Sequence, residues 1–200
     1  MTELSLNVLD AVQNSITAKA SLTEISVEIH TDENTLLITV RDNGLGMDSA
    51  TLSSVTDPFF TTGGKTTGLG VPLFKMSAEM TGGSFKISSE KNKGTEITAR
   101  YVLNSIDRAP LGDMPSLIET LAVCNTDIDF IYNYGVDGAG FTFDTVKIKK
   151  ILEGIPLNTP EVKGFIRDFL RENTAEINKK NTERKYAYEN LSRASGDKGK

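Results

Sequence analysis

The chain has 200 residues, with 22 basic and 27 acidic side chains and a formal net charge of −5. This length predicts one folded domain with an appendage, and 38% hydrophobic and 24% charged residues exclude a collagen-like, wholly disordered or multi-span membrane protein. No apolar run reaches the roughly 20 residues of a membrane helix, and the first residues lack a secretory signal. Because the acidic balance also disfavours nucleic-acid binding, we expect a cytoplasmic protein that binds neither membranes nor nucleic acid.

The first half of the sequence predicts helices and β-hairpins. Apolar residues follow three- and four-residue steps from Leu4 to Ala20, which indicates an amphipathic helix. The elements expected next are a hairpin over 25–40, a short helix over 48–55, a helix over 69–80 and a second hairpin over 84–103. Residues 57–70 are rich in threonine and glycine and predict a mobile loop. This order predicts an α/β (α+β) sandwich, in which helices pack on one face of a mixed β-sheet.

The second half begins with a proline- and glycine-containing linker over 107–112. The elements expected after it are a helix over 114–123, a hairpin over 129–144, and helices over 146–152 and 160–171. From Glu172 the chain is polar and charged, which is typical of disorder. The expected division is a first domain over 1–104, a small C-terminal α/β extension over 105–175 and a polar, disordered tail over 176–200.

Four short motifs in the first half contain the residues typical of nucleotide sites. They are Asp10-Ala-Val-Gln-Asn14 on the first helix, Asp42-Asn-Gly-Leu-Gly46-Met47 after a strand, Gly68-Leu-Gly70 at a helix start and Gly94-Thr95 at a strand turn. Asp10 and Asn14 lie about one helical turn apart and therefore face the same way. The Asn14 amide oxygen is a hard ligand suited to Mg²⁺ that bridges phosphates, and Asp10 is a candidate general base.

The other motifs suit the base and the phosphates of a nucleotide. The Asp42 carboxylate can accept a hydrogen bond from the exocyclic amine of adenine, where guanine has a carbonyl. Gly44 and Gly46 allow the backbone to approach a ligand closely. Gly68 and Gly70 leave backbone N–H groups free at a helix start, where the helix dipole favours phosphate.

The joint order and spacing of these motifs resemble the GHKL superfamily, which includes histidine-kinase ATP-binding domains, DNA gyrase and heat-shock chaperones. The resemblance covers residues 4–103 and implies a Bergerat-type ATP-binding fold, with Mg²⁺ as cofactor and ATP as substrate or ligand. The ATP contacts that it implies are Asn14, Asp42, Gly44, Gly46, Met47, Lys65, Gly68, Leu69, Gly70 and Thr95, with Asn14 as the Mg²⁺ ligand. It also implies an ATP lid over 57–67, in which Phe59 occupies an F-box-like position and Lys65 contacts the γ-phosphate.

The chain departs from this superfamily at Asp10, where gyrase has glutamate and many histidine kinases have asparagine. Two other phosphate-binding motifs are excluded. Gly64-Lys65-Thr66 lacks the first glycine of a Walker A loop, because Phe59 stands in its place. The segment 68–73 ends in Leu73, where a dinucleotide-binding fingerprint requires glycine.

The resemblance therefore implies a stand-alone bacterial ATP-binding domain over 1–104. Such a domain would hydrolyse Mg-ATP slowly or transfer phosphate to a separate partner protein in signalling. Two alternatives remain open: a non-catalytic, ATP-gated interaction module that presents residues 105–175, and an anti-sigma-type serine protein kinase. A protein partner is expected, and a homodimer is left open. His30 is expected to be a strand-end residue rather than a phosphoacceptor, and Cys124 to be buried.

Overall fold

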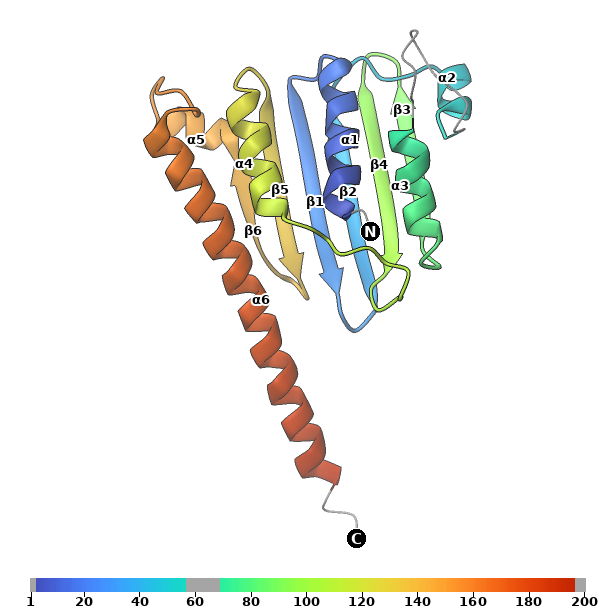
Figure 1. Ribbon diagram of the computed structural model, residues 1–200, viewed down its shortest axis with the longest axis vertical. Helices are drawn as coiled ribbons and strands as arrows, with labels where there is room; N and C mark the ends of the chain where they lie inside the picture. The colour runs from blue at the N-terminus through green and yellow to red at the C-terminus, as the bar shows by residue number, and fades with distance from the viewer. Residues whose placement is uncertain (1–2, 57–68, 197–200) are drawn as a thin grey trace.

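Six strands form one mixed sheet, and helices α1, α3, α4 and α6 cover one of its faces in the computed structural model (Figure 1). The structure describes residues 3–56 and 69–196, with side chains as far as Thr182. The elements in chain order are α1 (Leu4–Thr17), β1 (Leu22–His30), β2 (Thr35–Asp42), α2 (Ser49–Ser54), α3 (Gly70–Glu79), β3 (Ser84–Glu90), β4 (Gly94–Val102), α4 (Met114–Cys124), β5 (Asp129–Val136), β6 (Ala139–Asp144), α5 (Thr145–Ile151) and α6 (Pro160–Gly196).

The strand order is β3-β4-β2-β1-β5-β6. Strands β1 and β2, β2 and β4, β3 and β4, and β5 and β6 pair in antiparallel fashion, whereas β1 and β5 are parallel. The register of β2 and β4 places Asp42 opposite Thr95, so two of the four motifs lie side by side at one end of the sheet.

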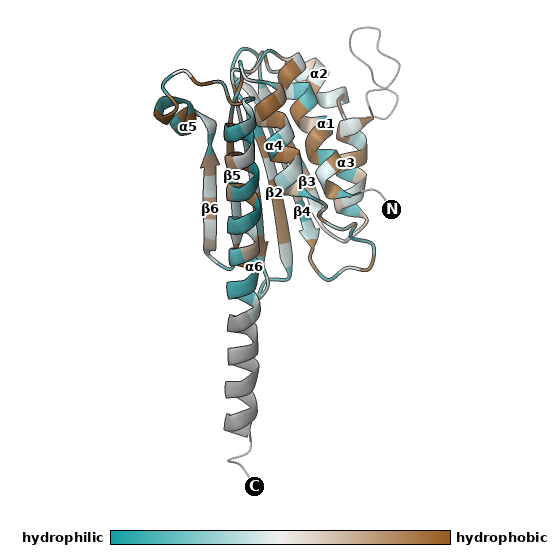
Figure 2. Ribbon diagram, turned by 60° about the vertical axis from the view of Figure 1, so that its left-hand side comes forward, coloured by the Kyte–Doolittle hydropathy of each residue, from teal (hydrophilic) through white to brown (hydrophobic). Residues whose placement is uncertain are grey.

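The strands alternate between a buried, helix-facing side and a more exposed side. On β1, for example, Ile25 and Val27 are buried while Glu24 and Glu28 lie on the other face. Burying a large aliphatic side chain contributes about 1.5–3 kcal/mol, so this face supplies much of the folding energy. Figure 2 shows hydrophobic residues distributed over α1, α3 and α4, whereas hydrophilic residues predominate along the described part of α6. A single cluster of buried residues runs from α1 to α6 and includes Phe130 and Tyr132 of β5.

The sequence-based expectations for the fold are confirmed in most respects. Helices do cover one face of a mixed sheet, and both predicted hairpins of the first half are present. The extension is also an α/β unit, but its strands β5 and β6 join the sheet of the first half instead of forming another. The predicted lid, residues 57–67, lies outside the described residues.

The expectation for the C-terminal tail differs from the structure, because α6 continues to Gly196 instead of ending at Arg171. The polar composition did not predict this helix, which packs against the rest of the fold along one side. Ile177 is buried, and the Tyr134 hydroxyl donates to Asn178 Oδ1 at 2.7 Å. A Glu176–Lys180 ion pair at 2.6 Å, one turn apart on the helix, adds a small further contribution.

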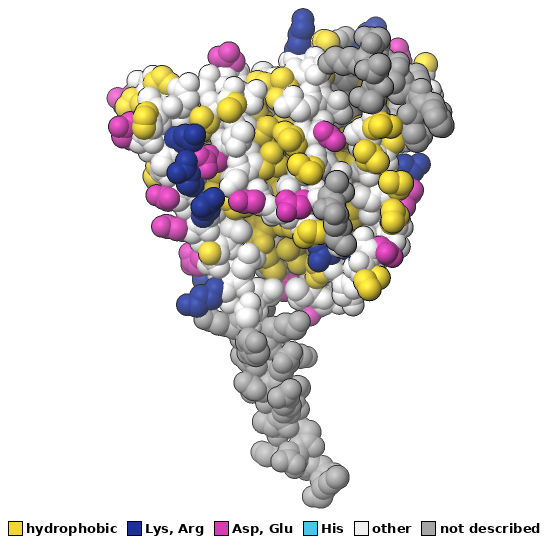
Figure 3. Space-filling model, in the orientation of Figure 1, with side chains coloured by type: hydrophobic (Ala, Val, Ile, Leu, Met, Phe, Trp, Pro, Cys, Tyr) yellow, Lys and Arg dark blue, Asp and Glu magenta, His cyan; other side chains and the backbone are white. Residues whose placement is uncertain are grey.

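Ion pairs also join α6 to α4. Arg167 contacts Glu119 at 2.9 Å, and Arg171 lies 3.9 Å from Asp113. Figure 3 shows the resulting mixture of acidic and basic side chains on this part of the helical face. Cys124, at the end of α4, is exposed, so the expectation that it is buried was wrong. Among the described helices, no stretch is both long and apolar enough to cross a lipid bilayer.

Candidate functional site

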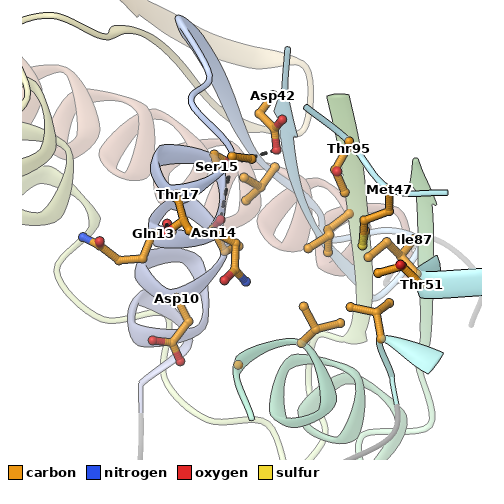
Figure 4. Close-up of a pocket in the computed structure, with 18 of the residues that line it drawn as sticks. Asp10, Gln13, Asn14, Ser15, Thr17, Asp42, Met47, Thr51, Ile87 and Thr95 are labelled. Carbon is orange, nitrogen blue, oxygen red and sulfur yellow. Dashed lines mark hydrogen bonds between the residues drawn. The ribbon is translucent and has the colours of Figure 1, made fainter. Parts of the chain in front are cut away.

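A cavity of about 620 Å³ opens between α1, α3 and the adjoining ends of β2 and β4 (Figure 4). It brings together residues from all four motifs. The predicted site residues that line it are Asp10, Asn14, Asp42, Gly46, Met47, Leu69, Gly70 and Thr95. Gly44 does not line the cavity, and Lys65 and Gly68 lie outside the described residues.

The Asp42 carboxylate stands at the sheet end of the cavity and is held from two sides. The Ser15 hydroxyl of α1 donates to Oδ2 at 2.9 Å, and the backbone N–H of Gly44 donates to Oδ1 at 2.8 Å. An ionised carboxylate accepts about four hydrogen bonds, so lone pairs remain for a ligand. Gly44 therefore acts through Asp42 rather than as a wall of the cavity.

The loop after β2 needs glycine at two positions. An ideal Cβ on Gly44 would lie 2.7 Å from the carbonyl oxygen of Ala18. Gly46 has a φ of +59°, and a side chain there would collide with the carbonyl of Glu90. Both glycines let this loop pass between α1 and the β3–β4 hairpin, so their first role is packing.

Ser89 of β3 fixes the same loop to Thr95. Its hydroxyl accepts from the Met47 backbone N–H at 2.8 Å, contacts Gly94 O at 2.9 Å and lies 2.9 Å from the Thr95 hydroxyl. With its single proton donated to Gly94 O, Ser89 accepts from Thr95 as well. The Thr95 oxygen then keeps free lone pairs beside Asp42.

Helix α1 supplies the opposite wall of the cavity. Asp10 and Asn14 both line the cavity from this helix, as their spacing predicts (Figure 4). The Asn14 side chain is exposed, and no hydrogen bond joins it to the rest of the described chain. Partial burial raises the pKa of Asp10 above its usual value, because desolvation disfavours the charged form.

Helix α3 begins at the cavity. Its N-cap residue, Leu69, provides no side-chain hydrogen bond to the first turn, so backbone N–H groups there are left for a ligand. An ideal Cβ on Gly70 would lie 3.0 Å from Asp10 Cβ. Gly70 therefore serves a second purpose, since it lets α3 approach α1 closely.

The remaining lining is mostly apolar, and the sequence reasoning did not assign it to the site. These residues include Val40, Leu45, Val55, Ile87 and Ile97. Val40, Ile87 and Ile97 lie on strands, and strand alternation does not reveal at which end of a sheet a cavity opens. Leu45 and Val55 lie outside the strands and carry no motif. Ser15 and Ser89 were also missed, because their hydrogen bonds join elements far apart in the sequence.

The fold and the site define a class of protein: a mixed sheet with helices on one face and a glycine-bordered cavity at the strand ends. Residues 2–105 match the model of a family described as "Histidine kinase-, DNA gyrase B-, and HSP90-like ATPase". The chain belongs to this family, and these residues form a histidine-kinase-like ATPase domain.

Sensor kinases are among the relatives that resemble this region. The chain is 38% identical over 106 residues to the sensor protein kinase FleS of Pseudomonas aeruginosa, covering 52% of this chain and 25% of the relative. It is 30% identical over 112 residues to the sensor histidine kinase ZraS of Escherichia coli, covering 56% of this chain and 23% of the relative. The chain thus spans a quarter or less of the length of these relatives.

Similarity to one solved structure supports the assignment of the fold and no other property. The crystal structure of the N-terminal domain of a DNA repair protein superposes with a TM-score of 0.51 at 17% sequence identity. The match covers 72% of this chain and 52% of the other.

Proposed function

We propose that the chain binds Mg-ATP in this cavity and either hydrolyses it slowly or transfers its γ-phosphate to a separate signalling protein. The observation that carries the proposal is that all four motifs, separated in the sequence, line one cavity. A chance set of turn glycines and solvated polar residues would have no reason to converge there.

The adenine ring fits the sheet end of the cavity. Asp42 offers a fixed acceptor for the exocyclic amine, and apolar side chains such as Met47 and Ile97 provide walls for the ring. Gly46 keeps the backbone close to this part of the cavity. The same carboxylate would face the carbonyl of guanine, so the site should prefer adenine.

The phosphates fit the end formed by Asn14 and the start of α3. Among the described lining residues, Asp10 and Asp42 are acidic and there is no lysine or arginine. A triphosphate placed there needs positive charge from elsewhere. The exposed Asn14 amide fits Mg²⁺, which keeps several waters and takes few protein ligands beside phosphate oxygens. When bound, the ion would neutralise phosphate charge, and Lys65, with Gly68, would complete the site from the lid.

Asp10 is the proposed general base. Its pKa is raised by partial burial, which makes the carboxylate a better proton acceptor. In hydrolysis it would take the proton of a water that attacks the γ-phosphorus as the bond to ADP breaks. In phosphotransfer it would take a proton from the acceptor group of the partner protein.

The relatives' names support a signalling kinase context, since they are sensor kinases. We place the ATP-binding domain at 1–104 and the extension at 105–175, with α6 continuing from the extension to Gly196. The ATP-gated interaction module remains a second candidate because the extension is joined directly to α1. The backbone N–H groups of Leu4 and Ser5 donate to the carbonyls of Pro110 and Leu111, both at 2.9 Å. The anti-sigma-type serine kinase differs from the leading proposal only in its acceptor.

The test is incubation of the purified chain with γ-labelled ATP and Mg²⁺, followed for release of phosphate, labelling of the chain and labelling of added proteins. Turnover that disappears in Asp10→Asn, with ATP binding retained, supports the enzyme. Binding without turnover in the wild type supports the interaction module. Absence of ATP binding would contradict both.

A further inference from the structure

Ser15 is a buried polar residue that none of the four motifs includes. It follows Asn14 directly on α1, is 1% exposed and lines the cavity. Its Oγ lies 2.9 Å from Asp42 Oδ2 and 3.3 Å from the carbonyl oxygen of Ala11. Figure 4 shows this hydroxyl between α1 and Asp42.

The single proton of the Ser15 hydroxyl can serve only one of these two acceptors at a time. The carboxylate is charged and is the nearer acceptor, so the stronger hydrogen bond goes to Asp42. Since Gly44 N–H occupies Oδ1 at 2.8 Å, each carboxylate oxygen has one donor from the protein. These donors come from two different elements and fix the plane of the carboxylate.

We propose that Ser15 is a positioning residue for base recognition: it holds Asp42 so that a remaining lone pair faces the exocyclic amine of adenine. This inference rests on the proposed function and assigns a further residue to the same site. Without Ser15 the carboxylate keeps its Gly44 contact but turns more freely about its side-chain bonds. The hydrogen bond to the amine then has to restrict that rotation as it forms, and affinity falls.

A purely structural role for Ser15 would give a different result. Asp42 is only partly buried and keeps its hydrogen bond from Gly44, and alanine is favoured over serine inside a helix. Ser15→Ala should therefore fold normally. What it should lose is the part of the binding energy that depends on the exocyclic amine.

The experiment compares ATP with purine riboside 5′-triphosphate, which is ATP without the exocyclic amine, by calorimetric titration in Mg²⁺. Wild-type chain should bind ATP more tightly than the analogue. In Ser15→Ala the Kd for ATP should rise about tenfold, the scale of one charge-assisted hydrogen bond, while the Kd for the analogue stays the same. Because both ligands are titrated into the same sample, partial unfolding cannot imitate a changed ratio.

Thr120→Ala is the matched control. The Thr120 hydroxyl donates to the carbonyl four residues earlier on α4, at 2.8 Å, but lies outside the cavity. This variant should keep the wild-type Kd for both ligands. An equal loss of affinity for both ligands in Ser15→Ala would show a general packing role, and unchanged affinity for both would show an idle hydroxyl; either result overturns the inference. If wild-type chain binds neither nucleotide, the proposed function itself fails.

Discussion

At the scale of single residues, two polar side chains should bind different parts of the nucleotide. In the proposed binding mode, Asp42 contacts the base and Asn14 contacts the Mg²⁺ ion at the phosphates. Each can be tested with a ligand that probes only its own end.

Asp42→Ala should weaken ATP binding by about 1.5–3 kcal/mol, because a hydrogen bond to a charged acceptor is lost. Affinity for GTP, which we expect to be lower in the wild type, should change much less. Titration of both nucleotides into wild type and variant measures the difference. Equal affinity of the wild type for ATP and GTP would refute the assignment of Asp42.

Asn14→Ala should reduce the Mg²⁺ dependence of ATP binding while leaving the melting temperature of the free chain nearly unchanged. The side chain is exposed, and alanine is well tolerated in a helix. ATP titrations with and without Mg²⁺, together with a thermal melt, separate the two effects. A large fall in melting temperature with unchanged metal dependence would indicate a structural role instead.

The raised pKa of Asp10 predicts how pH affects turnover and stability. Because burial penalises the ionised form, the proton is held to a higher pH than usual. General-base turnover should therefore fall as pH decreases through this raised pKa. For stability the sign is opposite: the penalty is absent below the ordinary pKa of an aspartate, grows as pH rises, and is complete above the raised pKa. Asp10→Asn at neutral pH should then abolish turnover without lowering the melting temperature, and a clear loss of stability would contradict this reading.

At the scale of elements, the loop after β2 is where backbone geometry matters most. Gly46→Ala should destabilise the fold by about 1–3 kcal/mol, since an L-residue at φ +59° would also meet the Glu90 carbonyl. Thermal or urea unfolding measures the loss.

Gly164→Ala should instead raise the free energy of unfolding by up to about 1 kcal/mol, because Gly164 lies in α6 with open space around the added methyl group. The same unfolding measurement checks it.

Most helices and hairpins were predictable from the sequence, because they depend on local patterns. The short helix α2 begins after Asp48, whose carboxylate accepts from the Thr51 N–H at 2.8 Å. In both early hairpins, the polar segment between the strands forms the turn. The motifs also converged on one cavity, as their order predicts. The length of α6 was not predictable from composition. Beyond Arg171, Ile177 is the one buried residue among the described side chains, and the hydrogen bond between Tyr134 and Asn178 adds a contact to another element.

At the scale of the whole molecule, the order of the strands in the sheet could not be predicted from local sequence patterns. Nothing in the segment 129–136 indicates that β5 pairs in parallel with β1 rather than starting another sheet. The contacts of Ser15 and Ser89 depend on the same long-range arrangement. Such pairings are decided by the packing of the complete core.

The continuous core makes a prediction about the proposed division at residue 104. A fragment of residues 1–104 would lose β5, which pairs with β1, and helices α4 and α6, whose buried residues belong to the same core cluster as Val27. It should unfold at a lower temperature and less cooperatively than the full chain, as measured by circular dichroism. A fragment that melts cooperatively and binds ATP with the full-length Kd would show instead that the extension is a separate domain.

The parallel pairing of β1 and β5 also has a consequence for how the chain folds. Leu22 pairs with Asp129, more than a hundred residues later, in the interior of the sheet. Contacts of such high sequence separation require closure of a long loop before they return any energy, and folding slows accordingly. During synthesis, all the residues that line the cavity leave the ribosome before β1 can pair with β5. The six-stranded sheet can be completed only after β5 has emerged, so its last two strands join after every residue that lines the cavity has been synthesised.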